Sequence, residues 1–296
     1  MPPMTDTQNM AETRQYATGV FMLIAAGLIL GAGGLTYRVL DTSDPWAVAF
    51  GRSLFFCIVL GIICLIRYGR RLPAQFIAAG LPGVFAGIGL SMAFTGYTAA
   101  MLSTTVADVM FILSAGPFYA AGLGWLILRE SVSRRSILFM LVAFSGIMVM
   151  VGGGVGGGRL EGNIWALMAS LGFAIAVVSI RFRPAVEMLP AALLGGFIAL
   201  IPGWVLMSDA PLTTWDWQLF VVIGGVQLAL GFVLITFGSR HVRAAETPLL
   251  LMTEIITAPL WAWAAVGETP SVSTLVGGGI VCFAVMAQAV MRLRES

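Results

Sequence analysis

The chain has no lysine, a single histidine and few charges of any kind, since only 10% of its residues are charged. A soluble domain carries about 25% charged residues. This shortage, together with 59% hydrophobic residues and a mean hydropathy of +0.96, predicts a protein whose solvent is the lipid bilayer. The missing lysine also excludes a phosphate-binding Gly-Lys-Ser/Thr loop, and with it ATP hydrolysis, as well as Schiff-base chemistry.

Cysteine and histidine are too few and too scattered for a metal centre or a protease. Cys57, Cys64 and Cys282 lie in apolar runs, where we expect them to pack as small hydrophobic residues. His241 is flanked by arginines in a loop, away from the serines of the apolar runs, which excludes a serine protease. The net charge of +2 reflects arginines that flank these runs. We therefore expect no enzyme, no cofactor, no metal and no nucleic-acid partner.

Long apolar runs fill most of the sequence. A spanning helix needs about 20 apolar residues, and the chain has room for about ten such helices. The runs that predict them are 17–37, 46–66, 73–99, 104–128, 134–152, 162–182, 190–207, 217–238, 245–266 and 272–291. The predicted fold is an all-α polytopic membrane protein with ten transmembrane helices, whose first span is retained as an anchor. The polar ends, 1–16 and 292–296, are expected to be a disordered tail and a short C-terminal tail.

Arginine predicts the orientation of these helices, because short loops rich in positive charge stay in the cytoplasm. Thirteen arginines lie in the termini and in every second loop, whereas the opposite loops hold only Arg38 and Arg159. Both termini are therefore expected in the cytoplasm, with the protein in a bacterial inner membrane.

The second half of the chain repeats the first. Residues 98–133 recur 138 positions later, at 236–271. The most telling matched pairs are Trp125 with Trp263, Glu130 with Glu268, and Asp108 with Glu246. Because each copy holds five helices, an odd number, the second copy is expected to enter the membrane upside down. This organisation comprises a first five-helix repeat at 17–152, a glycine-rich linker at 153–161 and a second, inverted repeat at 162–291.

A further pattern closes each half: a helix with proline or glutamate, then tryptophan, then glutamate at the loop. It runs from Gly116-Pro117 through Trp125 to Glu130, and from Glu254 through Pro259 and Trp263 to Glu268. This pattern resembles the EamA-type members of the drug/metabolite transporter superfamily, over nearly the whole chain. The resemblance implies an inner-membrane carrier of two inverted five-helix repeats that exports metabolites. The chain looks most like bacterial exporters of aromatic amino acids, although the family's Glu-Pro pair is split between Pro117 and Glu254.

Ionisable groups inside the spans are the first candidates for substrate binding, since each costs about 2.5–3.5 kcal/mol to insert. Glu254 lies roughly nine residues into its helix, too deep to cap it, and is expected to hold a substrate amino group or carry a proton. Asp108 and Glu246 lie near their helix starts, where substrate binding and capping are equally good interpretations. Arg52 fits a substrate carboxylate, but pairing with Asp41, Asp44 or a lipid headgroup is favoured.

Other polar and aromatic residues complete the candidate site. Ser91 and Gln227 interrupt stripes of small residues that otherwise favour close helix contact. The aromatic candidates are Tyr97, Tyr119, Trp165 and Trp263, for which positions in an interfacial belt are the alternative.

The sequence thus predicts a monomeric carrier that contacts membrane lipids and moves small solutes outward by alternating access. Amino acids, aromatic ones above all, are the expected substrates. Other organic solutes, lipophilic cations and a channel-like mechanism are the alternatives.

Overall fold

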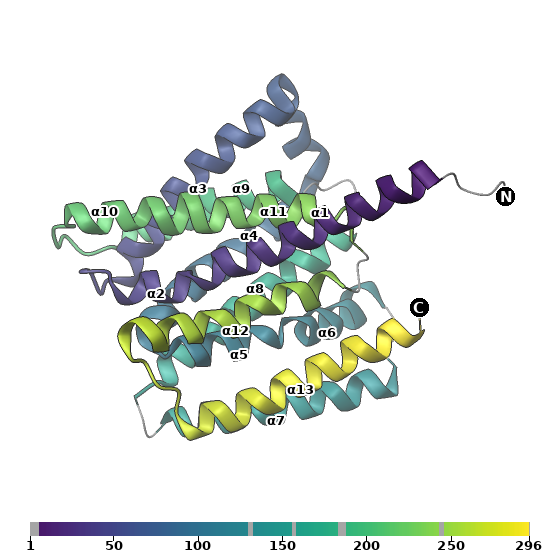
Figure 1. Ribbon diagram of the computed structural model, residues 1–296. Coiled ribbons are helices and arrows are strands. Elements are labelled where there is room, and N and C mark those ends of the chain that lie inside the picture. The colour runs from purple at the N-terminus through teal and green to yellow at the C-terminus, as the bar shows by residue number, and fades with distance from the viewer. Residues whose placement is uncertain (1–5, 130–132, 156–157, 183–187, 243–245, 296) are drawn as a thin grey trace.

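The protein is a bundle of helices (Figure 1). The computed structural model describes residues 6–129, 133–155, 158–182, 188–242 and 246–295, and within these ranges it contains no strand. The helices are α1 (Asp6–Gly31), α2 (Gly33–Arg38), α3 (Pro45–Tyr68), η1 (Gly69–Arg71), α4 (Leu72–Ser103), α5 (Val106–Ser114), α6 (Gly116–Leu128), α7 (Arg134–Val155), α8 (Leu160–Phe182), α9 (Met188–Leu206), α10 (Thr214–Phe220), η2 (Val221–Leu230), α11 (Gly231–Gly238), α12 (Thr247–Val266) and α13 (Val272–Glu295).

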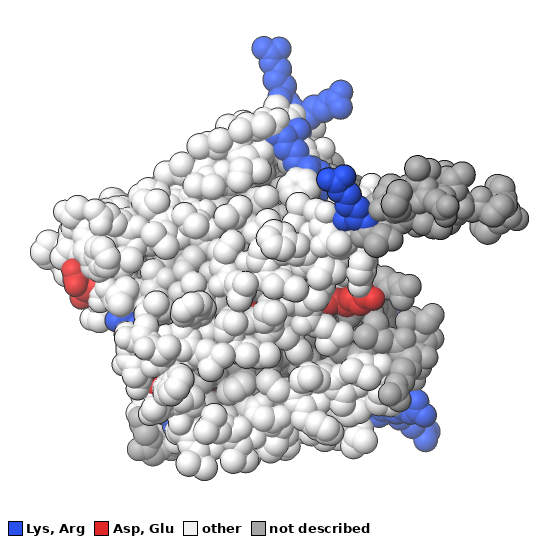
Figure 2. All heavy atoms as spheres, in the orientation of Figure 1, with Lys and Arg blue, Asp and Glu red and all other residues white. Residues whose placement is uncertain are grey.

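In the described part of the chain, eight helical stretches are long and apolar enough to cross a membrane, and Val272–Gln288 is a shorter apolar helix. One of the eight, Pro45–Ser103, contains both α3 and α4, which the turn at η1 separates. Each predicted run coincides with one helix or with consecutive helices. On the face shown in Figure 2, charges gather at the two ends of the bundle and leave an almost uncharged belt between them. The protein is therefore a multi-pass membrane protein.

We name the two ends of the bundle from the chain itself. The near end is where α1 begins and α13 ends, and the far end is the opposite one (Figure 1). Three predicted spans are built from more than one helix: α1 with α2, α5 with α6, and α10 with η2 and α11. The break between α5 and α6 falls just before Pro117, as expected of a residue that lacks an N–H and clashes with the preceding turn. The π-helical stretch η2 had no signal in the sequence.

Predicted boundaries differ from the structure at the two ends of the chain and at the linker. Helix α1 begins at Asp6, within the segment where we expected disorder, and α13 runs on to Glu295. Helix α7 continues through the first glycines of the predicted linker to Val155, and α8 starts at Leu160. These glycines serve packing, because a Cβ on Gly154 would lie 2.7 Å from the Asn163 side chain. The segment between the repeats is therefore shorter than predicted.

The two halves interlock. Helix α4 of the first half lies against α8 and α9, α1 lies against α11 and α12, and α7 lies against α13. Matched glycines make matched close approaches: a Cβ on Gly162 would lie 2.5 Å from Thr104, and one on its repeat partner Gly19 would lie 2.8 Å from Val242. Thr104 and Val242 are themselves repeat partners, 138 positions apart. The halves therefore use the same contact twice, in the manner of a two-fold relation.

The seam between α4 and α8, where the two helices are in closest contact, requires glycine, because it leaves no room for a Cβ. A Cβ on Gly89 would lie 2.5 Å from the Gly172 carbonyl oxygen and 2.8 Å from the Ala176 nitrogen. Because both neighbours are backbone atoms, neither can rotate away. Without a strong hydrophobic force between helices in lipid, such close packing is a main source of their association.

Replacing Gly89 by alanine is therefore expected to lower the melting temperature of the purified protein and its yield, since it forces α4 away from α8. The cost should be about 1–3 kcal/mol, as for overpacking in other close-packed interiors. The matched control is Gly122→Ala in α6, where an added Cβ meets nothing within 4 Å. Equal melting temperatures for the two variants would contradict this account of the seam.

At the far end, Asp44 caps α3 and ties it to the loop after α9. Its carboxylate accepts a hydrogen bond from the Trp46 nitrogen at 2.9 Å and one from the Ser208 nitrogen at 2.7 Å. Partial burial by itself would raise the pKa of Asp44, but the bonds from Ser208 and from the first turn of α3 outweigh it. The pKa of Asp44 is consequently lowered from its ordinary value of 3.8.

A carboxylate with a lowered pKa stabilises the fold above its ordinary pKa and loses that effect as the pH falls through the lowered value. We expect Asp44→Ala to cost about 0.5–2 kcal/mol at neutral pH, as for other helix caps. The difference in melting temperature between this variant and the parent should shrink below pH 4, following the lowered pKa. A difference that stays constant down to pH 3 would contradict the capping role.

Candidate substrate-binding site

A cavity of about 310 Å³ lies inside the bundle, between the two halves. Helices from both halves supply its walls, and most of the surface is apolar. The residues that bring polar groups to it are Tyr37, Arg52, Tyr97, Ser114, Ser170, Gln227 and Glu254. A mainly apolar cavity with a few convergent polar groups is typical of a small-molecule site.

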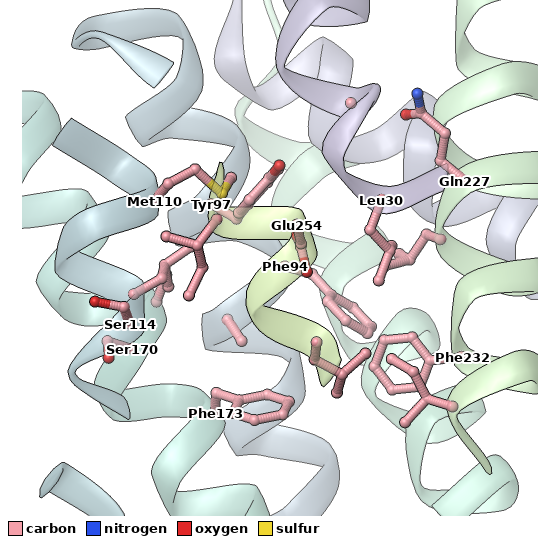
Figure 3. Close-up of a pocket in the computed structure, with 18 of the residues that line it drawn as sticks. Leu30, Phe94, Tyr97, Met110, Ser114, Ser170, Phe173, Gln227, Phe232 and Glu254 are labelled. Atoms are coloured by element: carbon pink, nitrogen blue, oxygen red, sulfur yellow. The ribbon is translucent and has the colours of Figure 1, made fainter. Parts of the chain in front are cut away.

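Glu254 lies on α12 in the middle of the cavity (Figure 3). The approach of α1 positions it, because a Cβ on Gly27 would lie 3.2 Å from the Glu254 nitrogen. Among the described residues, no hydrogen bond or ion pair engages the Glu254 carboxylate. A carboxylate without a protein partner in an apolar surrounding is costly, so its position is best explained by a ligand.

The wall toward the far end is polar. Gln227, in the π-helical stretch η2, donates from Nε2 to the Thr36 hydroxyl at 2.8 Å. Gly33 lies beneath it, where a Cβ would sit 3.3 Å from Gln227 Oε1 and 3.5 Å from the Tyr97 hydroxyl. The bare backbone at Gly33 thus lets two polar side chains converge on one point. Such π-helical turns often occur at functional sites.

The wall toward the near end is aromatic and aliphatic. Phe94 and Phe232 meet edge to face with ring centroids 5.7 Å apart, and Phe173 lies across from them (Figure 3). To one side, Ser114 and Ser170 line the cavity (Figure 3). The Ser170 hydroxyl is buried and has no hydrogen-bond partner. The cavity is therefore amphipathic, with polar groups toward the far end and rings toward the near end.

The structure brings three of the nine predicted site residues into the cavity: Tyr97, Gln227 and Glu254. The other six are not among the residues that line it: Ser91, Asp108, Tyr119, Trp165, Glu246 and Trp263. Arg52 also lines it, although the sequence favoured an acid or a lipid headgroup over a substrate carboxylate as its partner. Tyr37 lines it too and was not singled out in the sequence.

Asp108 lies at the far end, in a buried polar cluster. Its carboxylate pairs with Arg159 Nη1 at 2.8 Å and accepts hydrogen bonds from the hydroxyls of Thr104 at 3.1 Å, Thr105 at 2.9 Å and Thr274 at 2.6 Å. Its own N–H donates to Thr105, the N-cap of α5. The sequence offered substrate binding and helix capping as interpretations of Asp108. This geometry matches capping, because both carboxylate oxygens already have protein partners.

A second ion pair lies beside the first. Arg38 Nε bonds Glu268 Oε2 at 2.5 Å, and its other nitrogens donate to the carbonyls of Met101 and Thr104. Glu268 also accepts from the Val106 nitrogen at 2.6 Å. We call the two pairs, Asp108 with Arg159 and Arg38 with Glu268, the far-end latch. It links helices of both halves across the far end of the bundle.

Glu246, the repeat partner of Asp108, lies at the near end and is hydrogen-bonded very differently. Tyr16 donates to its Oε2 at 2.9 Å, in an exposed setting. The repeat relation extends to the donors, because Tyr16 and Arg159 are separated by the same 143 positions as Gly19 and Gly162. One end of the bundle is thus held by buried ion pairs, whereas at the other end the described residues give the matching position one exposed hydrogen bond.

The remaining predicted residues lie away from the cavity, either packed between helices or on the outside of the bundle. Ser91 is buried in α4, and Tyr119 of α6 is partly buried against a hydrophobic cluster that α7 and α13 also supply. Trp165 packs edge-on against Trp46 with ring centroids 6.2 Å apart. Trp263 is 58% exposed on the outside of the bundle, a position that fits the interfacial-belt alternative.

Comparison with known proteins agrees with this architecture. The model of the EamA-like transporter family matches residues 17–152 and again residues 160–288, so the two matches follow the two halves. The chain belongs to the EamA-like transporter family. Its fold is therefore that of a membrane transporter, and the cavity between its halves becomes the candidate transport site.

Similar curated proteins are transporters. An uncharacterized transporter of Archaeoglobus fulgidus is 26% identical over 277 residues, covering 90% of this chain and 95% of that protein. The pseudopaline exporter CntI of Pseudomonas aeruginosa is 24% identical over 283 residues, covering 90% and 97%. A solved crystal structure of a protein with 14% identity superimposes with a TM-score of 0.60 over 92% of this chain and 96% of that one, which shows a shared fold.

Proposed function

We propose that this EamA-like transporter exports small metabolites, chiefly amino acids with a preference for aromatic side chains, by alternating access through the central cavity. The observation that carries the proposal is the cavity itself. It places an acid, Glu254, and a base, Arg52, in the wall of one small space that is otherwise lined mainly by rings and aliphatic side chains. A zwitterion with an aromatic side chain matches that distribution of charge and apolar surface.

The proposed topology has ten crossings in two inverted five-helix repeats. The near end, which carries most of the arginines, would face the cytoplasm of a bacterial inner membrane. The interlocked pairs α1 with α11 and α4 with α8 support the repeat relation. The far-end latch then closes the outer side, and the state described here takes up substrate from the cytoplasm. Release outward requires the latch to open.

A second candidate is export of lipophilic cations or other organic solutes. It is favoured by Glu254, which lines the same cavity as Phe94, Phe173 and Phe232, so that the cavity fits a cation with apolar groups (Figure 3). A channel-like facilitator would use the same cavity without alternation.

Counterflow into proteoliposomes of the purified protein separates these functions. Radiolabelled phenylalanine, tryptophan, threonine and a lipophilic cation would each be offered, with and without an imposed pH gradient. Saturable counterflow of the aromatic amino acids is the expected result. Flux that rises linearly with concentration would indicate a pore, and exchange of the cation alone would support the second candidate.

A further inference from the structure

Arg52 is a buried cation in the cavity wall that lacks an acidic partner. It lies on α3 and is 6% exposed. Nη1 donates to the Phe94 carbonyl at 3.0 Å and to the Thr98 hydroxyl at 3.1 Å, both neutral acceptors on α4. Within the ranges that the structure describes, no carboxylate oxygen comes within 4.0 Å of its guanidinium. A buried charge with no counter-charge in contact with it is a position that a protein rarely keeps without a use for it.

The acids that the sequence offered as partners are engaged elsewhere. Asp44 accepts hydrogen bonds from the nitrogens of Trp46 and Ser208, and Asp41 accepts one from the Thr213 hydroxyl. The pairing of Arg52 with either acid, which we favoured from the sequence, is therefore not present. The positive charge of Arg52 remains available to the cavity.

The guanidinium is held in one orientation. It lies over the rings of Phe94 and Tyr97, 5.5 Å and 5.1 Å from their centroids. Thr98, which anchors Nη1, donates to the Phe94 carbonyl at 3.0 Å and also bonds the Tyr37 hydroxyl at 3.2 Å. Arg52 is thus positioned by a fixed network on α4 and α2 before any ligand arrives.

The opposite edge of the guanidinium is open. The structure gives hydrogen bonds from Nη1 only, so Nε and Nη2 have no bond to any residue in its described part. Neither nitrogen is among the buried polar atoms that protein encloses without a partner, so this edge faces the cavity. Two parallel N–H groups on one edge match the two oxygens of a carboxylate, a geometry that a lysine or an amide cannot copy.

We propose that Arg52 is the residue that selects for a carboxylate, binding one on the transported solute through Nε and Nη2 while Glu254 holds its ammonium group. This inference rests on the proposed function, which supplies the zwitterion. It adds a requirement that the function alone does not contain: the solute must carry an acid group, and removing that group must abolish recognition.

A role confined to joining α3 to α4 makes a different prediction. A helix link acts on every solute alike, because it sets the shape of the cavity and not the charge of its contents. Selection for a carboxylate changes the affinity of the acid and leaves its uncharged analogue nearly unaffected. The comparison of an acid with its analogue therefore separates the two roles.

The experiment uses the full-length protein in proteoliposomes and compares phenylalanine with phenylalaninol, which replaces the carboxylate by an alcohol. The variants are Arg52→Gln, Arg52→Lys and the control Arg71→Gln, an exposed arginine at the near end. In the parent and control we expect phenylalanine to compete for counterflow at least about tenfold better than phenylalaninol, as for loss of a charge-assisted pair. Arg52→Gln should bring the two within about twofold of each other, and Arg52→Lys should give an intermediate ratio.

Equal losses for both solutes in Arg52→Gln would overturn the proposal and leave Arg52 as a helix link. A thermal-stability panel of aromatic, aliphatic and dicarboxylic acids, each paired with its amide, covers the case in which no amino acid is transported. One outcome would refute the amino-acid assignment and keep the role of Arg52. In it, an acid raises the melting temperature of the parent but not of Arg52→Gln, and its amide raises the melting temperature of neither protein. Amides that stabilise the parent as well as their acids, or acids that all fail to stabilise it, would overturn the role itself.

Discussion

Substituting Glu254 by glutamine is expected to reduce counterflow of phenylalanine at least about thirtyfold, because losing one partner of a buried charge pair typically costs about 2–5 kcal/mol. Glutamine has nearly the same size, so the shape of the cavity is kept and only the charge is lost. Glu254→Asp, which keeps the charge but shortens the side chain, should retain part of the activity. Initial rates in proteoliposomes at several concentrations would give KM and the maximal rate for each variant.

The control for this substitution is Glu161→Gln, since Glu161 is an exposed carboxylate at the start of α8. It should transport like the parent. Both glutamine variants should also elute as folded protein in size-exclusion chromatography. Near-normal counterflow by Glu254→Gln would show that the ammonium group of the substrate is bound elsewhere, and would remove the observation on which the site is built.

In the proposed topology, breaking the far-end latch is expected to open the cavity to the outside. Asp108→Asn and Arg159→Gln each remove one charge from a buried pair, and a buried charge left alone costs about 3–5 kcal/mol. That cost falls on the state that contains the latch, so the population shifts toward states without it. A reporter Met110→Cys, introduced after replacement of the three native cysteines, should react with an external membrane-impermeant maleimide at least about tenfold faster in either latch variant, given that cost.

Asp209→Asn serves as the matched control, because Asp209 is an exposed acid in a far-end loop. It should leave the labelling rate unchanged. The double variant Asp108→Asn with Arg159→Gln should label no faster than the single variants, since the two residues form one interaction. Slow labelling in all of these variants would mean that the latch serves stability alone and that the outer gate lies elsewhere.

The parts of the molecule that follow from local sequence were predictable. Apolar runs placed the helices, because the length of a span depends only on the thickness of the bilayer. The recurrence of residues 98–133 at 236–271 revealed the two halves. Glu254 was found because its depth in the helix excludes a capping role.

Other features depend on tertiary packing and left no local signal. The sequence identified Arg52 as a buried charge but did not identify its partner. Asp44, a favoured candidate, instead accepts a hydrogen bond from Ser208, in a loop more than 160 positions away. The repeat suggested similar roles for Asp108 and Glu246, yet their donors, Arg159 and Tyr16, differ in charge. Helical spacing indicates which face a residue occupies, but it does not tell whether that face meets a cavity or another helix.

The interlocking of the two halves has a consequence for how the protein is made. The main neighbours of α1, α3, α4 and α7 belong to the second half: α11 and α12, α9 and η2, α8 and α9, and α13. When the ribosome has released only the helices up to α7 into the membrane, few of their packing surfaces have a partner. Assembly must therefore wait for the second half, and a chain cut between α7 and α8 should mature only when both fragments are synthesised together.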